Sequence, residues 1–432
     1  MKIIQSFWSK PAFHTDQNYS NARGIGGWLN FRYFLMSTAL SCLTLKKHHK
    51  RIELVTDSHG KSLFSDILGL PFDHISTDLD QLSDEDHRLW ILGKMKAIRS
   101  QEEPFIHVDN DVFVWESLPS SNSSDYLIAQ SRFPIWGAYK LSLNEIFANF
   151  AFVPECLAER PTANTMVANV GIIGGNDIEF FQEFARISNE LLERNRNHLQ
   201  SIDIGGFNQM MEEYLFTSLV RHKKRELTYL LESSAHSFPE SHLNFSLTPM
   251  IYKYIHLIGR NKQILSCCEQ IALRLKIEFP EFYKKVNEVV TEFQGFQENS
   301  VMTDRQERLM RSILINSQSD LALLERRKIR LVPGVKIHAA PNETTGELNY
   351  IASTTDATRG NVVYKTLPQE GFVNADRWLK YFTRPISIAE LYERLRADDT
   401  SSNSRQLHHR ADFEILSAVM WNIVVTGIFE YE

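Results

Sequence analysis

The sequence predicts an α/β protein with a smaller domain at its C-terminal end, and two observations support this. In the first part of the chain, apolar runs of strand length alternate with segments whose apolar residues recur at helical spacing. From residue 329 on, the pattern changes to β-branched runs followed by helical segments. Because alternating strands and helices favour parallel pairing, we expect a largely parallel sheet with helices on both faces.

The first domain is expected to span residues 1–265. Its strands are predicted from short apolar runs at 2–8, 51–57, 104–115, 126–131, 166–175 and 250–259. Its helices are predicted from apolar periodicity at 29–49, 60–70, 87–100, 177–194 and 205–222. A helical connector at 266–328 follows, interrupted at Pro280 and by a polar stretch at 295–304. The expected organisation is therefore a large α/β domain joined by helices to a smaller one.

Residues 329–432 are predicted to form a small winged-helix-like α+β domain. Two β-branched runs flank a polar turn at 341–347, which suits a hairpin, and residues 360–367 are a candidate third strand. An insertion at 354–361 leaves the register of that strand open. Helical segments are predicted at 374–382, 387–395 and 411–429, with Ser387 as the cap of the second.

Composition excludes several functional classes. The chain has 432 residues and a formal net charge of −6, so no overall basic field favours a nucleic-acid partner. The N-terminus lacks the apolar core of a signal peptide, and no stretch reaches the roughly 18 apolar residues of a spanning helix. We expect a soluble cytoplasmic protein and leave its oligomeric state open. Its four cysteines lack metal-site spacing and are expected to be free thiols: Cys42, Cys156, Cys267 and Cys268.

Two carboxylates one residue apart interrupt the apolar run at 104–115. Asp109, Asn110 and Asp111 stand where a buried strand leaves the sheet, and ligands bind at the carboxyl ends of strands in open α/β sheets. Residues i and i+2 of a strand face the same side, so both carboxylates can reach one Mg²⁺ or Mn²⁺ ion. The alternative is a turn in which these side chains cap backbone amides.

A second motif follows the last predicted strand of the first domain. His256, Gly259 and Lys262 have H-x-x-G-x-x-K spacing. An imidazole can complete a metal site, a glycine lets the backbone approach a phosphate, and a lysine supplies a charge to it. A hydrogen-bonded histidine at a strand end is the alternative for His256 alone. The pairing of the two motifs favours a site for the diphosphate of a nucleotide-sugar.

Further candidates lie at strand ends and on one helix. Ser6, Trp8 and Asp57 follow the first two strands and are candidates for contacts with a base and ribose, although a strand-end Asp is commonly a cap. Lys94 lies on the helix before Asp109, where its charge can reach phosphates. A solvated lysine on the helix face is the alternative.

With these motifs in this order, residues 1–265 resemble the GT-A glycosyltransferases, particularly the retaining, glycogenin- and galactosyltransferase-like family 8. In that family a D-x-D strand and a later H-x-x-G-x-x-K segment hold a Mn²⁺-bound UDP-sugar. The resemblance implies that Asp109, Asp111 and His256 are ligands of Mn²⁺ or Mg²⁺. It also implies that Lys262 contacts the diphosphate and that Gly259 flanks it.

The same resemblance assigns residues around the sugar. The stretch at 168–175 is similar to the N-x-G strand and turn of that family, which places Asn169, Gly174 and Gly175 near the donor sugar. Glu212 and Glu213 occupy the place of the family's acid-glutamine pair, so that Glu213 stands where Gln is usual. The side chain of Asn110 is expected to point either away from the sugar or toward it.

The C-terminal domain resembles the PqqD-like recognition elements of enzymes that modify ribosomally synthesised peptides. In that family a leader peptide adds as an extra strand beside the hairpin, which uses the unpaired backbone groups of a sheet edge. An ordinary winged-helix-like packing or dimerisation module is the alternative.

The two resemblances together imply a metal-dependent hexosyltransferase, retaining by analogy, that glycosylates a precursor peptide. Tethering raises the effective concentration of a weak acceptor. Two alternatives stay open: a glycosyltransferase acting on a cell-surface glycan or lipid-linked sugar, and a non-catalytic adaptor that binds a nucleotide-sugar or peptide.

Overall fold

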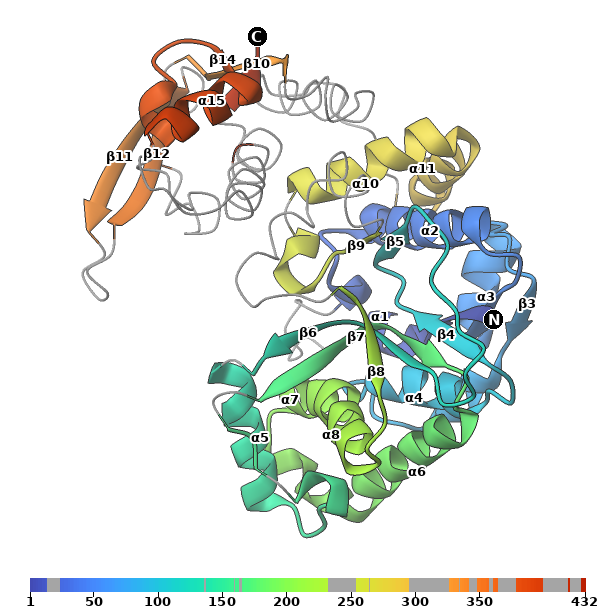
Figure 1. Ribbon diagram of the computed structural model, residues 1–432. Coiled ribbons are helices and arrows are strands. Elements are labelled where there is room, and N and C mark those ends of the chain that lie inside the picture. The colour runs from blue at the N-terminus through green and yellow to red at the C-terminus, as the bar shows by residue number, and fades with distance from the viewer. Residues whose placement is uncertain are drawn as a thin grey trace. The chain divides into compact units, whose positions relative to one another are not determined.

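The structure is a computed structural model, and it divides into two compact units that we describe separately (Figure 1). The first unit comprises residues 1–236, 256–259 and 278–295, and the second comprises the remaining residues. Within them, the structure describes residues 1–13, 24–135, 137–158, 160–162, 165–231, 254–263, 265–294, 326–333, 335–341, 348–356, 360–363, 378–398, 419 and 429–432.

A seven-stranded sheet forms the centre of the first unit, in the order β3-β2-β1-β4-β7-β6-β8. Its strands are β1 (Lys2–Phe7), β2 (Ile52–Thr56), β3 (His74–Ser76), β4 (Phe105–Val108), β6 (Leu127–Pro134), β7 (Met166–Gly175) and β8 (Leu227–Leu231). The predicted mixture of strands and helices is confirmed, and most neighbouring strands are parallel, including β6 and β8, but the direction of β7 makes the sheet mixed. Strands β3, β2, β1 and β4 are parallel, whereas β7 is antiparallel to both β4 and β6.

Helices lie on both faces of this sheet. Those of the first unit are α1 (Ser9–Phe13), α2 (Phe31–His48), α3 (Ser58–Lys61), α4 (Ile91–Arg99), α5 (Gly137–Asn149), α6 (Ile178–Asn195), α7 (Ile204–Gln209), α8 (Leu215–His222) and α11 (Pro280–Gln294). Shorter turns are η1 (Gly24–Gly27), η2 (Ser62–Ile67), η3 (Asp78–Leu82), η4 (Glu155–Leu157), η5 (Arg196–Ser201) and η6 (Met210–Tyr214). The helix predicted at 205–222 is thus α7 and α8 joined by the π-helical η6.

The main hydrophobic core lies between the sheet and helices α4, α6 and α8, and is rich in buried phenylalanines such as Phe181, Phe184 and Phe216. On the other side, α2 is buried along almost its whole length because α11 covers it. The Arg32 guanidinium of α2 donates to Asn287 Oδ1 at 2.8 Å and to Tyr283 Oη at 3.1 Å, both on α11. Part of the predicted connector therefore belongs to the first unit.

Local sequence explains where several helices begin. Asn30 and Asp177 cap α2 and α6, accepting from the amides of Tyr33 at 3.1 Å and Phe180 at 3.0 Å. The interruption predicted at Pro280 is confirmed, because α10 (Leu265–Glu278) ends before it and α11 begins on it. The polar stretch at 295–304 lies outside the described residues.

The second unit contains two small antiparallel sheets. One has the order β14-β10-β15, from β14 (Ile386–Ser387), β10 (Lys328–Leu331) and β15 (Phe429–Tyr431). The other has the order β11-β12-β13, from β11 (Val335–Pro341), β12 (Leu348–Asp356) and β13 (Gly360–Val363). The predicted hairpin and third strand are confirmed as β11, β12 and β13, and the insertion at 354–361 contributes to the ends of β12 and β13.

Helix α15 (Ile388–Asp398) confirms the predicted helix after Pro385, and Ser387 caps it by accepting from the Glu390 amide at 3.1 Å. The segment predicted at 374–382 contains the short turn η10 (Leu379–Tyr381) among its described residues. Of the last predicted helix, at 411–429, only residues 419 and 429 are described, and residue 429 begins β15.

Across the described part of the chain, no helix combines the length and apolarity needed to cross a membrane. All four cysteines are free thiols, as predicted; Cys42, Cys267 and Cys268 are buried and Cys156 is half-buried.

Candidate functional site

The Asp109–Asn110–Asp111 stretch is a turn between two strands. The strand predicted at 104–115 is divided into β4 and β5 (Val112–Val114), and the Val112 amide closes the turn by donating to Asp109 O at 3.1 Å. Helix α2 binds the carbonyls of the turn: Ser37 Oγ donates to Asn110 O at 3.1 Å and Ser41 Oγ to Val112 O at 2.6 Å. The turn is therefore fixed against α2 at the carboxyl end of β4.

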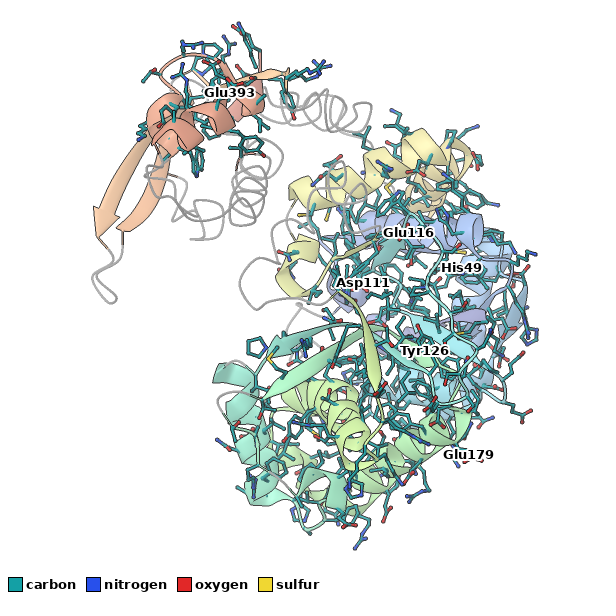
Figure 2. The ribbon with its side chains drawn as sticks, viewed as in Figure 1. His49, Asp111, Glu116, Tyr126, Glu179 and Glu393 are labelled. Atoms are coloured by element: carbon teal, nitrogen blue, oxygen red, sulfur yellow. The ribbon has the colours of Figure 1, made fainter. Side chains whose placement is uncertain are left out.

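His256 lies beside this turn, although it is far away in sequence. The strand predicted at 250–259 is described as β9 (Tyr254–His256), which pairs with β5 rather than joining the central sheet. The Leu257 amide donates to Asp111 O at 3.1 Å, which holds the end of β9 against the turn. Figure 2 labels Asp111 in this region of the first unit.

Asp109, Asp111 and His256 form a cluster whose ligand-type atoms all lie within 4.8 Å of one another. His256 Nε2 is 3.4 Å from Asp111 Oδ1. Asp111 and His256 are buried and Asp109 is half-buried. Two carboxylates and one imidazole suit a divalent ion such as Mn²⁺, which accepts both oxygen and nitrogen ligands. The predicted ligand set is thus brought together.

Gln130 of β6 orients His256. Its Oε1 lies 2.8 Å from His256 Nδ1, and both side chains are buried. Gly171 of β7 provides the space for this pair, because a Cβ there would lie 2.3 Å from His256 Cε1 and 2.7 Å from Gln130 Oε1. Neither Gln130 nor Gly171 was among the predicted site residues.

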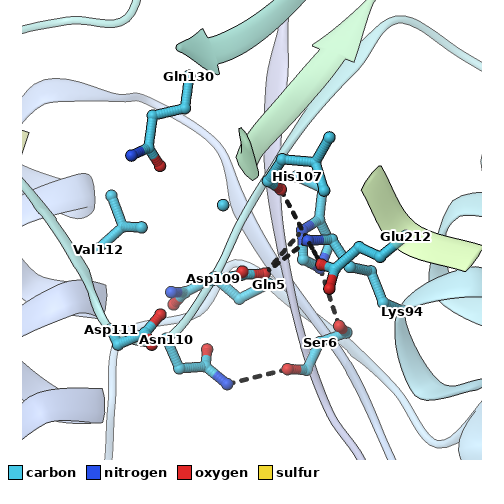
Figure 3. Close-up of polar contacts among 12 residues, drawn as sticks. Gln5, Ser6, Lys94, His107, Asp109, Asn110, Asp111, Val112, Gln130 and Glu212 are labelled. Atoms are coloured by element: carbon cyan, nitrogen blue, oxygen red, sulfur yellow. Dashed lines mark hydrogen bonds and ion pairs between the residues drawn. The ribbon is translucent and has the colours of Figure 1, made fainter. Parts of the chain in front are cut away.

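Lys94 is buried inside the site, with 6% of the residue exposed. Its ammonium group donates to Asp109 Oδ1 at 2.9 Å, to Val170 O at 2.7 Å and to Glu212 Oε1 at 2.5 Å (Figure 3). The alternative of a solvated helix lysine is wrong, because burial and three acceptors hold this group. The expected phosphate contact also finds no support, since an ammonium group has three N–H donors and the protein binds all three.

The charges of the site do not balance. Burial alone would lower the pKa of Lys94, but the carboxylates of Asp109 and Glu212 raise it above its ordinary value. Burial raises the pKa of Asp109 to about 6, with Lys94 opposing and with Glu212 and Asp111 adding to the rise. Burial and the Glu212 carboxylate also raise the pKa of Glu213 well above its ordinary value. Asp109 and Glu212 thus share one lysine, and Asp111 lies beside Asp109 in the same cluster, so the carboxylates outnumber the ammonium group and favour the binding of a cation.

The other predicted site residues on and near β1 and β4 form hydrogen bonds with neighbouring residues of the protein. Ser6 Oγ lies 2.8 Å from His107 Nε2, and Ser6 O accepts from Asn110 Nδ2 at 2.9 Å. Burial and the Lys94 charge lower the pKa of His107 well below its ordinary value, so this imidazole is neutral. Asn169 Oδ1 accepts from the Gly171 amide at 3.0 Å and helps to shape β7.

Asp57 and Trp8 have structural roles. Asp57 Oδ1 accepts from the Gly60 amide at 2.8 Å and caps α3, while Oδ2 accepts from Ser9 N at 2.8 Å and Ser9 Oγ at 2.7 Å. The cap alternative for Asp57 is therefore confirmed. Trp8 is buried in the main core and packs over Gly93 of α4, where an added Cβ would lie 3.0 Å from Trp8 Cβ.

The glycines predicted near the sugar are not brought to the cluster. Gly174 and Gly175 pair with Ile106 and Phe105, at the end of β4 opposite to Asp109. Close packing explains why glycine stands at both positions: a Cβ on Gly174 would lie 2.2 Å from Phe105 O, and a Cβ on Gly175 would lie 2.0 Å from Tyr126 O. Gly259 has a φ of +56° and begins η8 (Gly259–Gln263), with open space where a Cβ would stand. Lys262 belongs to the second unit, and its carbonyl accepts from Cys268 Sγ at 3.2 Å.

The first unit is thus a mixed α/β body with an Asp-Asp-His cluster at the carboxyl end of a central strand. Residues 1–289 match the model of a protein family of unknown function, DUF6734, and the chain belongs to that family. The matched region includes the whole cluster, Lys94, Gln130 and Glu212. No curated protein matches the sequence.

Proposed function

We propose that the protein is a metal-dependent glycosyltransferase that takes a sugar from a nucleotide-sugar, with a UDP-sugar as the expected donor. The observation that carries the proposal is the convergence of Asp109, Asp111 and His256 at the carboxyl end of β4, within 4.8 Å of one another. In open α/β sheets this end of a strand is where ligands bind. A single D-x-D motif would be weak support, but a buried imidazole beside both carboxylates is the third ligand that the sequence resemblance requires.

The residues present fit a divalent ion. Carboxylate oxygens and one imidazole nitrogen are ligands that Mn²⁺ accepts. The carboxylates of Asp109, Asp111 and Glu212 outnumber the single ammonium group of Lys94, which leaves negative charge to be neutralised. When bound, Mn²⁺ or Mg²⁺ would stabilise the negative charge that develops on a leaving diphosphate. Asp109, Asp111 and His256 would hold the ion, while Lys94 holds Asp109 and Glu212 in place.

Glu212 and Glu213 are proposed to face the donor sugar. The carboxylate of Glu212 accepts a hydrogen bond from the ammonium group of Lys94, which holds it in place. Glu213 differs, because its raised pKa favours the neutral carboxylic acid. A neutral carboxyl offers one donor and one acceptor, as a glutamine amide does. This supports the resemblance at the position where the related enzymes have Gln.

The proposed acceptor is a ribosomally synthesised peptide, recruited by the second unit. Support comes from the small antiparallel sheet β11-β12-β13 of this unit. Among the described residues, β11 and β13 are the edge strands of that sheet. An edge strand offers unpaired backbone groups to an added peptide strand. By the resemblance to PqqD-like elements, the added strand is proposed to be the leader peptide of the precursor.

A test of the transferase activity needs no acceptor. The purified chain is incubated with Mn²⁺ and a panel of UDP- and GDP-sugars, and donor hydrolysis is followed with and without EDTA. We expect Mn²⁺-dependent hydrolysis of at least one donor, and its loss in Asp109→Asn and Asp111→Asn. Asp80→Asn is the matched control, because Asp80 is an exposed aspartate outside the cluster that accepts from Ser58 N at 2.8 Å and from Ser58 Oγ at 2.6 Å.

Absence of metal-dependent hydrolysis and of metal-dependent donor binding would refute the proposal. Donor binding without hydrolysis, unchanged by added peptide, would instead support a non-catalytic adaptor.

A further inference from the structure

Strand β7 is irregular where it passes the site. It pairs with β6 at Ile173–Ala129 and again at Asn169–Ser131, so three residues of β7 (Val170–Ile172) lie opposite one residue of β6, Gln130. We call Val170–Ile172 the β7 bulge. Bulges bend a strand and redirect side chains, and they are frequent next to functional sites.

The β7 bulge contacts Lys94 and two members of the cluster, Asp109 and His256. Val170 O accepts from Lys94 Nζ at 2.7 Å, and Gly171 O accepts from the Asp109 amide at 2.8 Å. The Cα of Gly171 faces His256, and only the absence of a Cβ leaves room for the imidazole. The bulge therefore aligns the lysine, one carboxylate and the histidine.

Gln130 stands opposite the bulge and faces His256 Nδ1 at 2.8 Å. In Figure 3 its amide points toward the turn that carries Asp109 and Asp111. An amide oxygen can only accept, so its contact with the ring favours the tautomer of a neutral His256 that carries its proton on Nδ1. Nε2 then keeps its lone pair, and this is the nitrogen 3.4 Å from Asp111 Oδ1.

We propose that Gln130 is a positioning residue that keeps the His256 proton on Nδ1, so that Nε2 is presented to a divalent ion together with Asp109 and Asp111. Its metal role rests on the proposed function. Metal-bound histidines in proteins almost always donate their second N–H to such a partner, and loss of the partner typically weakens metal binding 10- to 100-fold.

Two readouts on the full chain separate this inference from the proposed function. The first uses ¹⁵N-histidine NMR without metal or nucleotide at pH 8, with His256 assigned from the signals absent in His256→Asn. We expect His256 protonated on Nδ1 in the wild type and a shift toward the Nε2-protonated tautomer in Gln130→Met. A wild-type ring protonated on Nε2 would refute the inference without reference to any variant.

The second readout is Mn²⁺ binding, measured by calorimetry and by the EPR signal of free Mn²⁺. Gln130→Met is expected to bind Mn²⁺ 10- to 100-fold more weakly than the wild type, whereas Gln130→Glu keeps an acceptor for Nδ1–H and is expected to stay within about threefold. Gln101→Met is the matched control, because Gln101 is a buried glutamine that binds Ala97 O outside the cluster. It should bind Mn²⁺ as the wild type does.

The outcomes are distinct. Wild-type affinity in Gln130→Met would overturn the role of Gln130 and leave the proposed function standing. Absence of Mn²⁺ binding in the wild type would overturn the proposed function and the metal role of Gln130 together, while the tautomer measurement would still decide whether Gln130 orients His256.

Discussion

Removing the buried charge of Lys94 should destabilise the first unit strongly. In Lys94→Met a flexible apolar chain of similar length replaces the lysine, but Asp109 and Glu212 lose their common partner at 2.9 and 2.5 Å. Breaking a buried ion pair from one side costs about 3–5 kcal/mol, and the unpaired Val170 carbonyl adds about 1 kcal/mol. We expect a loss of about 4 kcal/mol in the free energy of unfolding, because partial protonation of the carboxyls relieves some of this cost.

The assay is urea unfolding followed by tryptophan fluorescence at pH 7.5, in EDTA so that no metal replaces the lost charge. Lys96→Met is the matched control: Lys96 lies on the same helix, is more exposed and binds only Gln81 Oε1 at 2.7 Å, so its loss should cost under about 0.5 kcal/mol. Adding Glu212→Gln to Lys94→Met should recover about 1–3 kcal/mol, because it removes one of the two uncompensated charges.

The pH dependence gives a second check on the same variant. Burial raises the pKa of Asp109 and Lys94 opposes this rise, so without Lys94 the folded-state pKa of Asp109 should lie further above its unfolded value and the folded state should bind more protons. The deficit of Lys94→Met should therefore shrink as the pH falls from 7.5 to 5 and grow as it rises. A loss below about 1 kcal/mol, or a deficit independent of pH, would show that Lys94 does not neutralise these carboxylates.

Three further predictions address other parts of the first unit. Burial lowers the pKa of His49 to about 4, with the charge of His48 adding to the effect. Because His49, labelled in Figure 2, is only half-buried, we expect the free energy of unfolding to fall by about 1–2 kcal/mol between pH 7 and pH 4.5, as the unfolded chain takes up the proton. The fall should be smaller in His49→Gln, and equal slopes for the two proteins in acid-dependent urea titrations would contradict this. Gly174→Ala should destabilise by at least about 1–3 kcal/mol in the same assay, because its methyl group would meet Phe105 O at 2.2 Å, and an unchanged urea midpoint would be evidence against that packing. Mn²⁺ at 100 times its dissociation constant should add about 2.7 kcal/mol to the free energy of unfolding of the wild type but not of Asp111→Asn, and calorimetric melting that shows equal stabilisation of both would place the ion elsewhere.

The sequence was sufficient to locate most strands and helices, because apolar periodicity reports which residues are buried. It did not report strand direction: a mostly apolar run such as Met166–Gly175 has the same pattern whether its neighbours are parallel or antiparallel, and β7 is antiparallel to both. Helix α5 and strand β8 were missed. Strand β8 is only partly buried, so it lacks the continuous apolar run that identifies central strands.

For the site, spacing identified the three clustered side chains, because ligand chemistry restricts the residue types. It could not identify what holds them. Lys94 looked available to a phosphate, and only the fold shows that Asp109, Glu212 and Val170 O surround it. Gln130 carried a usable signal, since it is a polar residue within the apolar run at 126–131, as the aspartates are in theirs. Gly171 is the glycine of the N-x-G pattern at 169–171, but that pattern could not show that Gly171 contacts a histidine distant in sequence.

The β7 bulge also has a consequence for the order of events during synthesis. Both carboxylates, Lys94 and the bulge are made well before His256, so the sheet can pair around the turn while the imidazole is still missing. In the folded chain the imidazole of His256 occupies the space beside Gly171, so this space is filled only after β9 has docked. Binding of a metal by the three proposed ligands would therefore report that the chain has been completed past Leu257 and that β9 has docked. A nascent first domain that ends at β8 would expose an acidic turn with no third ligand.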